Sequence, residues 1–153
     1  MSHTTAIKGI KIQNIAALTA AIAELNGKGV KCSLAENATP RAYFPNQPGL
    51  GLADYVVRLD DAAYDVGLYK QEDGSYEART DFWSSPSTGK PVASILGGVA
   101  TKPEYNEQSK MGRLFQAYGI HAAMHEARKQ GKSVRRIDNE QTGEVKLVLT
   151  GFN

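Results

Sequence analysis

The sequence predicts an α+β fold in which two helices pack on a mainly antiparallel sheet. Strand-like patterns flank a helical pattern at the start of the chain, and three short strand patterns follow one another in the middle. A long amphipathic helix and a hairpin pattern close the chain. The length of 153 residues predicts a single domain over 1–153, interrupted by irregular insertions at 40–53 and 84–106.

The first quarter of the chain reads as strand, helix, strand. Residues 4–14, "TTAIKGIKIQN", alternate and predict a strand. Asn14 can cap the next helix, in which apolar residues recur one or two turns apart against an alanine-rich background: Ile15, Leu18, Ile22 and Leu25. The glycines of "NGKG" at 26–29 end this helix, and "VKCSLAE" at 30–36 reads as a second strand.

The middle of the chain reads as a meander between two irregular stretches. Residues 40–53 contain three prolines and cannot be regular. Three β-rich runs follow, "DYVVRLD" at 54–60, "YDVGLYK" at 64–70 and "SYEARTDFW" at 75–83. The next stretch, 84–106, is long for a loop in a compact domain, and loops of this length are usually functional or mobile.

The last third of the chain predicts a helix over 107–130 that Gly131 ends. One narrow sector of this helix carries the residues expected to pack: Met111, Leu114, Phe115, Tyr118, Ala122 and His125. Residues 132–152 then read as a hairpin around the turn "NEQTGE".

Charge is segregated along the chain. Between Lys110 and Arg136 there are seven Lys or Arg residues and one acid, Glu126, whereas the remainder holds 11 basic and 15 acidic residues. Such a segment creates a local positive field although the net charge is only +2. A solvated helix face fits the same spacing equally well, so both interpretations stay open.

The sequence gives weaker support to an enzyme than to a binding protein. His121 and His125 are four residues apart on the last helix, but zinc needs three or four ligands, and the position after His121 is Ala122 where zinc proteases have their glutamate. "GKS" at 131–133 follows a helix, the wrong place for a phosphate loop. No nucleophile–base pattern surrounds the lone Cys32. We therefore predict no catalytic residue, no metal site and no cofactor.

Nucleic-acid binding fits the basic segment better. Arginine pairs with phosphates and stacks on bases, and aromatic side chains beside a cationic track are typical of proteins that bind single strands. In the meander we expect Tyr69 and Trp83 on the exposed face beside Arg79. The candidate nucleic-acid-binding residues are therefore Lys110, Arg113, Arg128, Lys132, Arg135, Arg136, Arg79, Tyr69 and Trp83.

Several motifs occur in an order that resembles a known family: "MSH-x-T-x-I-K" at 1–8, "YDVGLY" at 64–69, "DFW" at 81–83, "LFQAYGIHAAMHEARKQG" at 114–131 and "GEVKLVL" at 143–149. The order resembles a family of small proteins from algal plastids, cyanobacteria and tailed phages that is catalogued as a domain of unknown function. The resemblance covers most of the chain except the two insertions. It implies an α+β fold and no established enzyme activity.

A narrower resemblance is to the single-stranded-DNA-binding cofactors of RNA polymerase in lytic podophages, through size and the basic final third. It implies single-stranded DNA and an RNA polymerase as partners, in the cytoplasm of a bacterial host cell. A homo-oligomer, for example a tetramer, would lengthen a short binding track. Two other hypotheses stay open: an adaptor or inhibitor that docks on a host protein, and a metal-dependent enzyme using His121 and His125. No apolar run is long enough to span a membrane.

Overall fold

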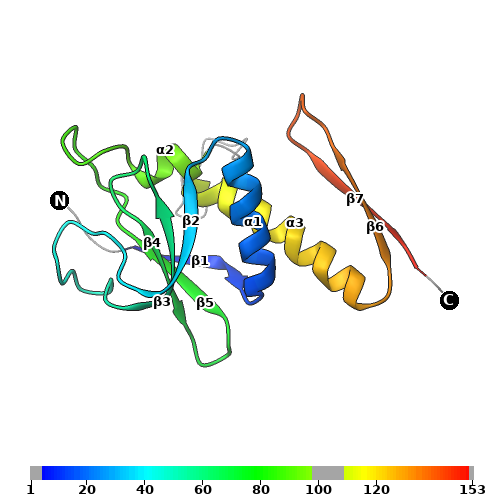
Figure 1. The fold of residues 1–153 in the computed structure, drawn as a ribbon, viewed down its shortest axis with the longest axis horizontal. Helices are drawn as coiled ribbons and strands as arrows, with labels where there is room; N and C mark the ends of the chain where they lie inside the picture. Colours follow the sequence, from blue (N-terminus) through cyan, green and yellow to red (C-terminus); the bar gives the residue numbers. More distant parts are fainter. Residues whose placement is uncertain (1–4, 98–108, 152–153) are drawn as a thin grey trace.

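A five-stranded sheet forms the centre of the protein in the computed structural model, which describes residues 5–97 and 109–151 (Figure 1). Its strands are β1 Thr5–Ile12, β2 Cys32–Ala38, β3 Ala53–Leu59, β4 Val66–Lys70 and β5 Tyr76–Thr80. They lie in the order β1-β5-β4-β3-β2, and every neighbouring pair is antiparallel. The α+β class is therefore confirmed.

Two helices cover one face of this sheet. Helix α1 spans Ile15–Gly27 and α3 spans Gly112–Lys129, preceded by a short 3₁₀ turn, η1, at Ser109–Met111. As predicted, the Asn14 side chain caps α1 by accepting from the Ala17 amide at 3.1 Å. The helices and the sheet share one core, in which the side chains of Leu18, Val57, Leu68 and Leu114 are fully buried. Burial of this apolar surface is the main force that fixes the helices on the sheet.

The loop 39–52 packs against the opposite face of the sheet. The Arg41 guanidinium reaches the fully buried carboxylate of Asp65 at 2.8 Å, and the Arg41 amide donates to the same carboxylate at 2.9 Å. Arg58 Nη1 and the Leu59 amide also donate to Asp65, at 3.1 and 3.2 Å. These contacts satisfy a buried charge, which explains how a segment without helix or strand keeps a defined path.

Two expectations about the middle of the chain need correction. The strand predicted over 75–83 ends at Thr80, because the Asp81 carboxylate accepts from the Trp83 amide at 2.9 Å and turns the chain. The stretch 84–106 is not wholly irregular, since a short helix, α2, occupies Val92–Leu96 and buries its first and last residues. Residues 98–106 of that stretch lie outside the described residues.

Two further corrections concern the end of the chain. The predicted hairpin forms, as β6 Ser133–Asp138 and β7 Val145–Thr150, but it makes a separate two-stranded sheet and does not join the central one. His125 was expected to pack and is exposed. Figure 1 shows the reason: the first half of α3 lies over the sheet, whereas its second half runs past the sheet toward the hairpin.

None of the helices in residues 5–97 and 109–151 has both the length and the apolar character needed to cross a membrane.

Candidate nucleic-acid interface

The β6–β7 hairpin has two chemically different faces. Directly paired residues of an antiparallel ladder point to the same side, so the register Val134↔Leu149 to Asp138↔Val145 sorts the side chains. The inner face, turned toward α1 and α3, comprises Val134, Arg136, Asp138, Val145, Leu147 and Leu149. The outer face comprises Ser133, Arg135, Ile137, Lys146, Val148 and Thr150.

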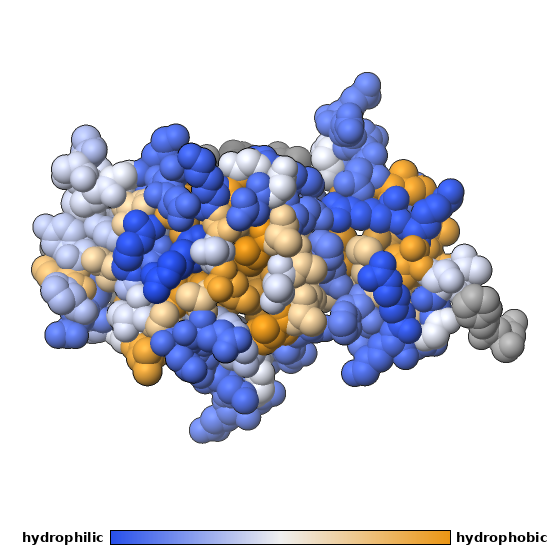
Figure 2. Space-filling view, in the orientation of Figure 1, coloured by the Kyte–Doolittle hydropathy of each residue, from blue (hydrophilic) through white to orange (hydrophobic). Residues whose placement is uncertain are grey.

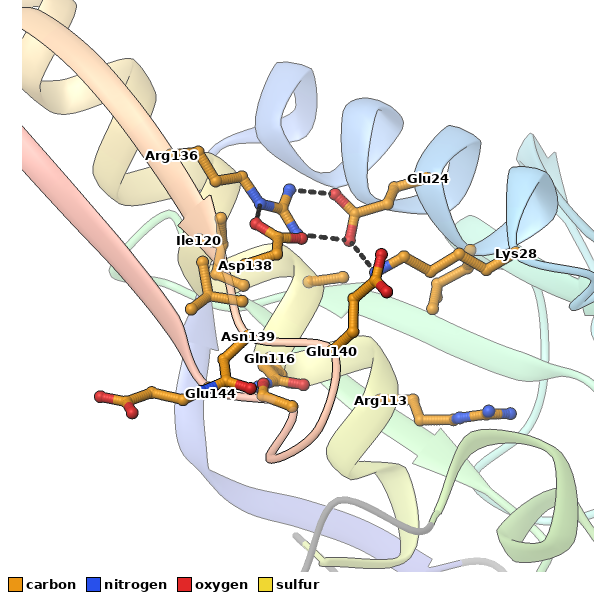
Figure 3. Close-up of a pocket in the computed structure, with 14 residues that line it drawn as sticks. Glu24, Lys28, Arg113, Gln116, Ile120, Arg136, Asp138, Asn139, Glu140 and Glu144 are labelled. Atoms are coloured by element: carbon orange, nitrogen blue, oxygen red, sulfur yellow. Dashed lines mark hydrogen bonds and ion pairs between the residues drawn. The ribbon is translucent and has the colours of Figure 1, made fainter.

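Arg136 fastens the inner face to the body of the protein. Its guanidinium forms a two-pronged ion pair with Glu24 of α1, with Nη2 3.1 Å from Oε2, and its Nε donates to Asp138 at 2.8 Å. Glu24 also pairs with His121 at 3.0 Å and with Lys28 at 3.2 Å. Figure 3 shows Glu24 and Arg136 facing each other between α1 and the hairpin.

The electrostatics of Glu24 follow from these partners. The hydrogen bond from Arg136 is the largest cause that lowers the pKa of Glu24, and it outweighs the opposing effect of burial, leaving the pKa at about 2. The same pair raises the pKa of Arg136. Arg136 was a candidate phosphate ligand, but the structure uses its charge within the fold.

The outer face presents cations without such partners. Arg135 and Lys146 are exposed, and they are diagonal neighbours across the ladder, since Arg135 pairs with Val148 and Ile137 with Lys146. Diagonal neighbours lie roughly 7–8 Å apart. Neither forms an ion pair within the described part of the chain, and the same holds for three cations where α3 leads into β6: Arg128, Lys129 and Lys132. We call these five residues the basic surface.

Charge along the hairpin runs from basic to acidic. The basic surface begins where α3 meets β6, whereas the exposed turn between the strands carries Glu140 and Glu144. A polyanion would therefore meet attraction along the hairpin's base and middle and repulsion at its tip.

Lys110 and Arg113 lie at the other end of α3. The 18 residues of this helix make it about 27 Å long, so these cations are remote from Arg128. Lys110 Nζ sits 5.0 Å from the centre of the Phe82 ring, and Arg113 Nη1 donates to the Ile95 carbonyl at 3.3 Å. The structure thus does not join them to the basic surface as one track.

Tyr69 and Arg79 are partners of each other on the central sheet. The Arg79 guanidinium carbon lies 4.5 Å from the centre of the Tyr69 ring, and Arg79 Nε pairs with Glu77 at 2.7 Å. The ring also lies over Gly67, where an added Cβ would come within 2.7 Å of it, and its hydroxyl donates to the Gly51 carbonyl at 2.9 Å. Tyr69 is therefore much less available for base stacking than expected.

Trp83 belongs to an aromatic cluster that sequence reasoning missed. Tyr43 of the loop 39–52 meets both Trp83 and Phe44 edge-to-face, with ring centres 5.3 and 4.7 Å apart. Tyr43 and Phe44 are 49% and 52% exposed, so this cluster is an apolar surface patch. The signal was present in "RAYFP", which the proline content had assigned to an irregular loop.

The geometry gives little support to the hypothesis of a metal site. Among the described residues there is no group of three or more His, Cys, Asp or Glu side chains placed to hold an ion. His121 is engaged with Glu24, whereas His125 points into solvent on the same helix. Burial raises the pKa of the Cys32 thiol, which lowers the fraction of reactive thiolate.

A cavity of about 320 Å³ lies between α1, α3 and the tip of the hairpin (Figure 3). Its charged lining mixes both signs: Glu24, Asp138, Glu140 and Glu144 with Lys28, Arg113 and Arg136. Such a lining selects neither an anion nor a cation. The cavity is best explained as the gap left where the hairpin tip overhangs the helices.

Comparison with known proteins gave one family. Residues 28–148 match a family model described as "Protein of unknown function (DUF1257)", in agreement with the resemblance of the motifs to a family of unknown function. Neither the curated proteins nor the solved structures gave a significant match.

Proposed function

The chain belongs to this family of proteins of unknown function, and we propose that it is a non-enzymatic protein that binds single-stranded DNA through the basic surface. The observation that carries the proposal is the group of five cations, Arg128, Lys129, Lys132, Arg135 and Lys146, none of which has an acidic partner among the described residues.

Unpaired cations suit a phosphate backbone because binding then breaks no ion pair within the protein. Each phosphate contact releases a counterion, which makes affinity fall as salt rises. Ile137 and Val148 lie between Arg135 and Lys146 on the outer face, and such apolar side chains can contact unstacked bases. A single strand exposes its bases, whereas a duplex hides them in the stack.

The first experiment titrates labelled oligo-dT by fluorescence anisotropy at several salt concentrations. The variant Arg135→Ala/Lys146→Ala should bind several-fold more weakly, and its log–log salt slope should be shallower by about 1.4, since each single-strand contact contributes about 0.7. Arg136 is left intact because its loss would loosen the hairpin.

The matched control is Lys31→Ala/Lys70→Ala. It removes the same two charges from exposed positions on the body that form no ion pair in the described ranges. Near wild-type binding by this control assigns the effect to the basic surface. An equal loss in both variants, or tighter binding of a duplex of the same length, would contradict the proposal.

The aromatic cluster favours a second function, that of an adaptor. Exposed aromatic side chains are enriched at protein interfaces, and Tyr43 and Phe44 are exposed beside the half-buried Trp83. The loop 39–52, which carries Tyr43 and Phe44, lies on the side of the central sheet away from the hairpin (Figure 1). The resemblance to phage transcription cofactors makes an RNA polymerase the partner to test. Phe44→Ser should abolish polymerase capture in nuclease-treated extract without weakening oligo-dT binding, and unchanged capture would remove this assignment.

A further inference from the structure

Strand β7 of the hairpin has an open edge among the described residues. Within the part of the chain that the structure describes, its ladder partner is β6, and the two strands form a sheet by themselves. An isolated two-stranded sheet is marginally stable, and an open strand edge is a template for another strand. The question is which strand fits.

The hydrogen-bonding groups at this edge can be assigned. The Asn139 amide donates to the Glu144 carbonyl at 2.8 Å, and hydrogen-bonded pairs alternate along an antiparallel ladder. The contiguous register then makes Ile137↔Lys146 and Arg135↔Val148 hydrogen-bonded pairs. The N–H and C=O groups of Leu147 and Leu149 consequently point away from β6, toward the open edge.

The two strands of the hairpin differ in how they protect their edges. β6 carries Arg135, Arg136 and Asp138, and charges of this kind discourage strand addition. β7, "VKLVLT", has one charge, no proline and an unbroken register with β6. Leu149 on this strand is 48% exposed. Figure 2 shows hydrophobic surface over the hairpin, bordered by hydrophilic side chains.

We propose that β7 pairs with β7 of a second copy of this chain, antiparallel about Val148, to give a four-stranded sheet. The sequence around Val148 is self-complementary in this arrangement. Leu147 of each copy lies opposite Leu149 of the other, so outward-pointing backbone groups meet outward-pointing backbone groups. A two-fold pair needs only one such surface, which both copies supply.

Charge agrees with this register. Lys146 lies opposite Thr150 of the second copy, four residues from the other Lys146, so the two ammonium groups are separated by about 13 Å along the strands. The hairpin tips point in opposite directions. Both outer faces fall on one side of the joined sheet, so Arg135 and Lys146 of the two copies share a surface. This pairing does not depend on the proposed function, but it would double the length of a DNA track.

The expected contact is small. With Val148 at the centre, the residues of β7 that pair are 146–150 of each copy, far fewer than the roughly 20–30 residues a side of a standard interface. The dimer should therefore be weak and form in a concentration-dependent way.

The test measures mass by sedimentation, without nucleic acid, from about 1 µM to 1 mM protein. Wild type should move from one copy of 16.5 kDa toward two. Leu149→Lys places a charge in the contact, and Leu149→Pro removes an outward N–H that the hairpin itself does not use. Both variants should stay monomeric.

Ile137→Lys is the matched control. Ile137 is similarly exposed, at 43%, and the substitution adds the same charge, but it lies on β6, away from the contact. It should dimerise as wild type does, and circular dichroism checks that every variant keeps its strands. A monomeric wild type at the highest concentration, a dimer that survives both Leu149 variants, or equal disruption by Ile137→Lys would each overturn the proposal. Because nucleic acid is absent, none of these outcomes bears on DNA binding.

Discussion

Glu24 is one residue that holds two elements of the last third of the chain, α3 and the hairpin, against α1. It is the charged residue of α1, "IAALTAAIAELNG", and it accepts from Arg136, His121 and Lys28 at once. A carboxylate with several cationic donors is held ionised. Because Arg136 comes from β6 and His121 from α3, this single side chain connects α1, α3 and the hairpin.

Replacing Glu24 by glutamine should destabilise the protein. Glu24→Gln leaves Arg136, a half-buried cation, with Asp138 as its acidic partner, so we expect a loss of roughly 1–3 kcal/mol in unfolding free energy at neutral pH. Urea denaturation measures this. The control Glu126→Gln removes an exposed carboxylate that accepts from Gln130, and should change stability by less than about 0.5 kcal/mol. Equal effects of the two variants would contradict the role given to Glu24.

The same residue predicts a pH dependence. The pKa of Glu24 is lowered in the folded protein from its ordinary value of 4.5 to about 2. A lowered folded pKa means that the stabilisation is complete above pH 4.5 and is lost as the pH falls toward 2. The stability difference between wild type and Glu24→Gln should therefore shrink across this window. A difference that is constant from pH 5 to about 2 would show that charge is not its cause.

At the scale of elements, the two halves of α3 have different structural roles. Its first half buries Leu114, Phe115 and Tyr118 against the core, and its second half exposes His125 and Arg128. Tyr118 also reaches the junction between β1 and α1, where its hydroxyl oxygen accepts from the amides of Gln13 and Asn14 at 2.8 and 3.1 Å. These amides lie at the start of α1, where backbone donors have no partner within the helix.

Tyr118→Phe should therefore lower the free energy of unfolding by more than the loss of one hydroxyl group suggests. Two partly buried N–H groups would lose their acceptor while the ring still filled its place, and we expect a loss of about 1–3 kcal/mol by thermal or urea unfolding. Tyr43→Phe is the control, since Tyr43 is 49% exposed. If both variants unfold alike, the amides find another acceptor and the junction does not depend on Tyr118.

Local patterns predicted the elements well, and long-range contacts explain the misses. Asn14 correctly marked the start of α1, and the glycines after it marked the end. Helical periodicity placed His125 in the predicted apolar sector of α3, because periodicity does not show where the sheet beneath a helix ends. Arg136 looked like a surface cation since its partner, Glu24, is 112 residues away in the chain. Tyr69 was expected to be exposed because the sequence does not show that Arg79, on another strand, covers its ring.

At the scale of the whole molecule, the chain forms two sheets that share few contacts. The central sheet is closed by α1 and α3 around a buried core, whereas the hairpin stands at one end and is held by its inner face (Figure 1). Elements with few buried contacts open independently of the global fold. Arg135 and Lys146 of the basic surface lie on this hairpin, so binding of the proposed DNA strand and the stability of the hairpin should influence each other.

This arrangement predicts two levels of amide hydrogen exchange. In dilute solution, the amides of Arg135 and Ile137 in the hairpin should exchange faster than those of Val57 and Leu68 in the central sheet. Glu24→Gln should accelerate exchange in the hairpin by about tenfold for each 1.4 kcal/mol lost, with little effect on the central sheet. Exchange followed by mass spectrometry separates the two regions. Uniform acceleration across both sheets would mean that the molecule opens as one unit, and the hairpin would then have no independent freedom for a ligand to restrict.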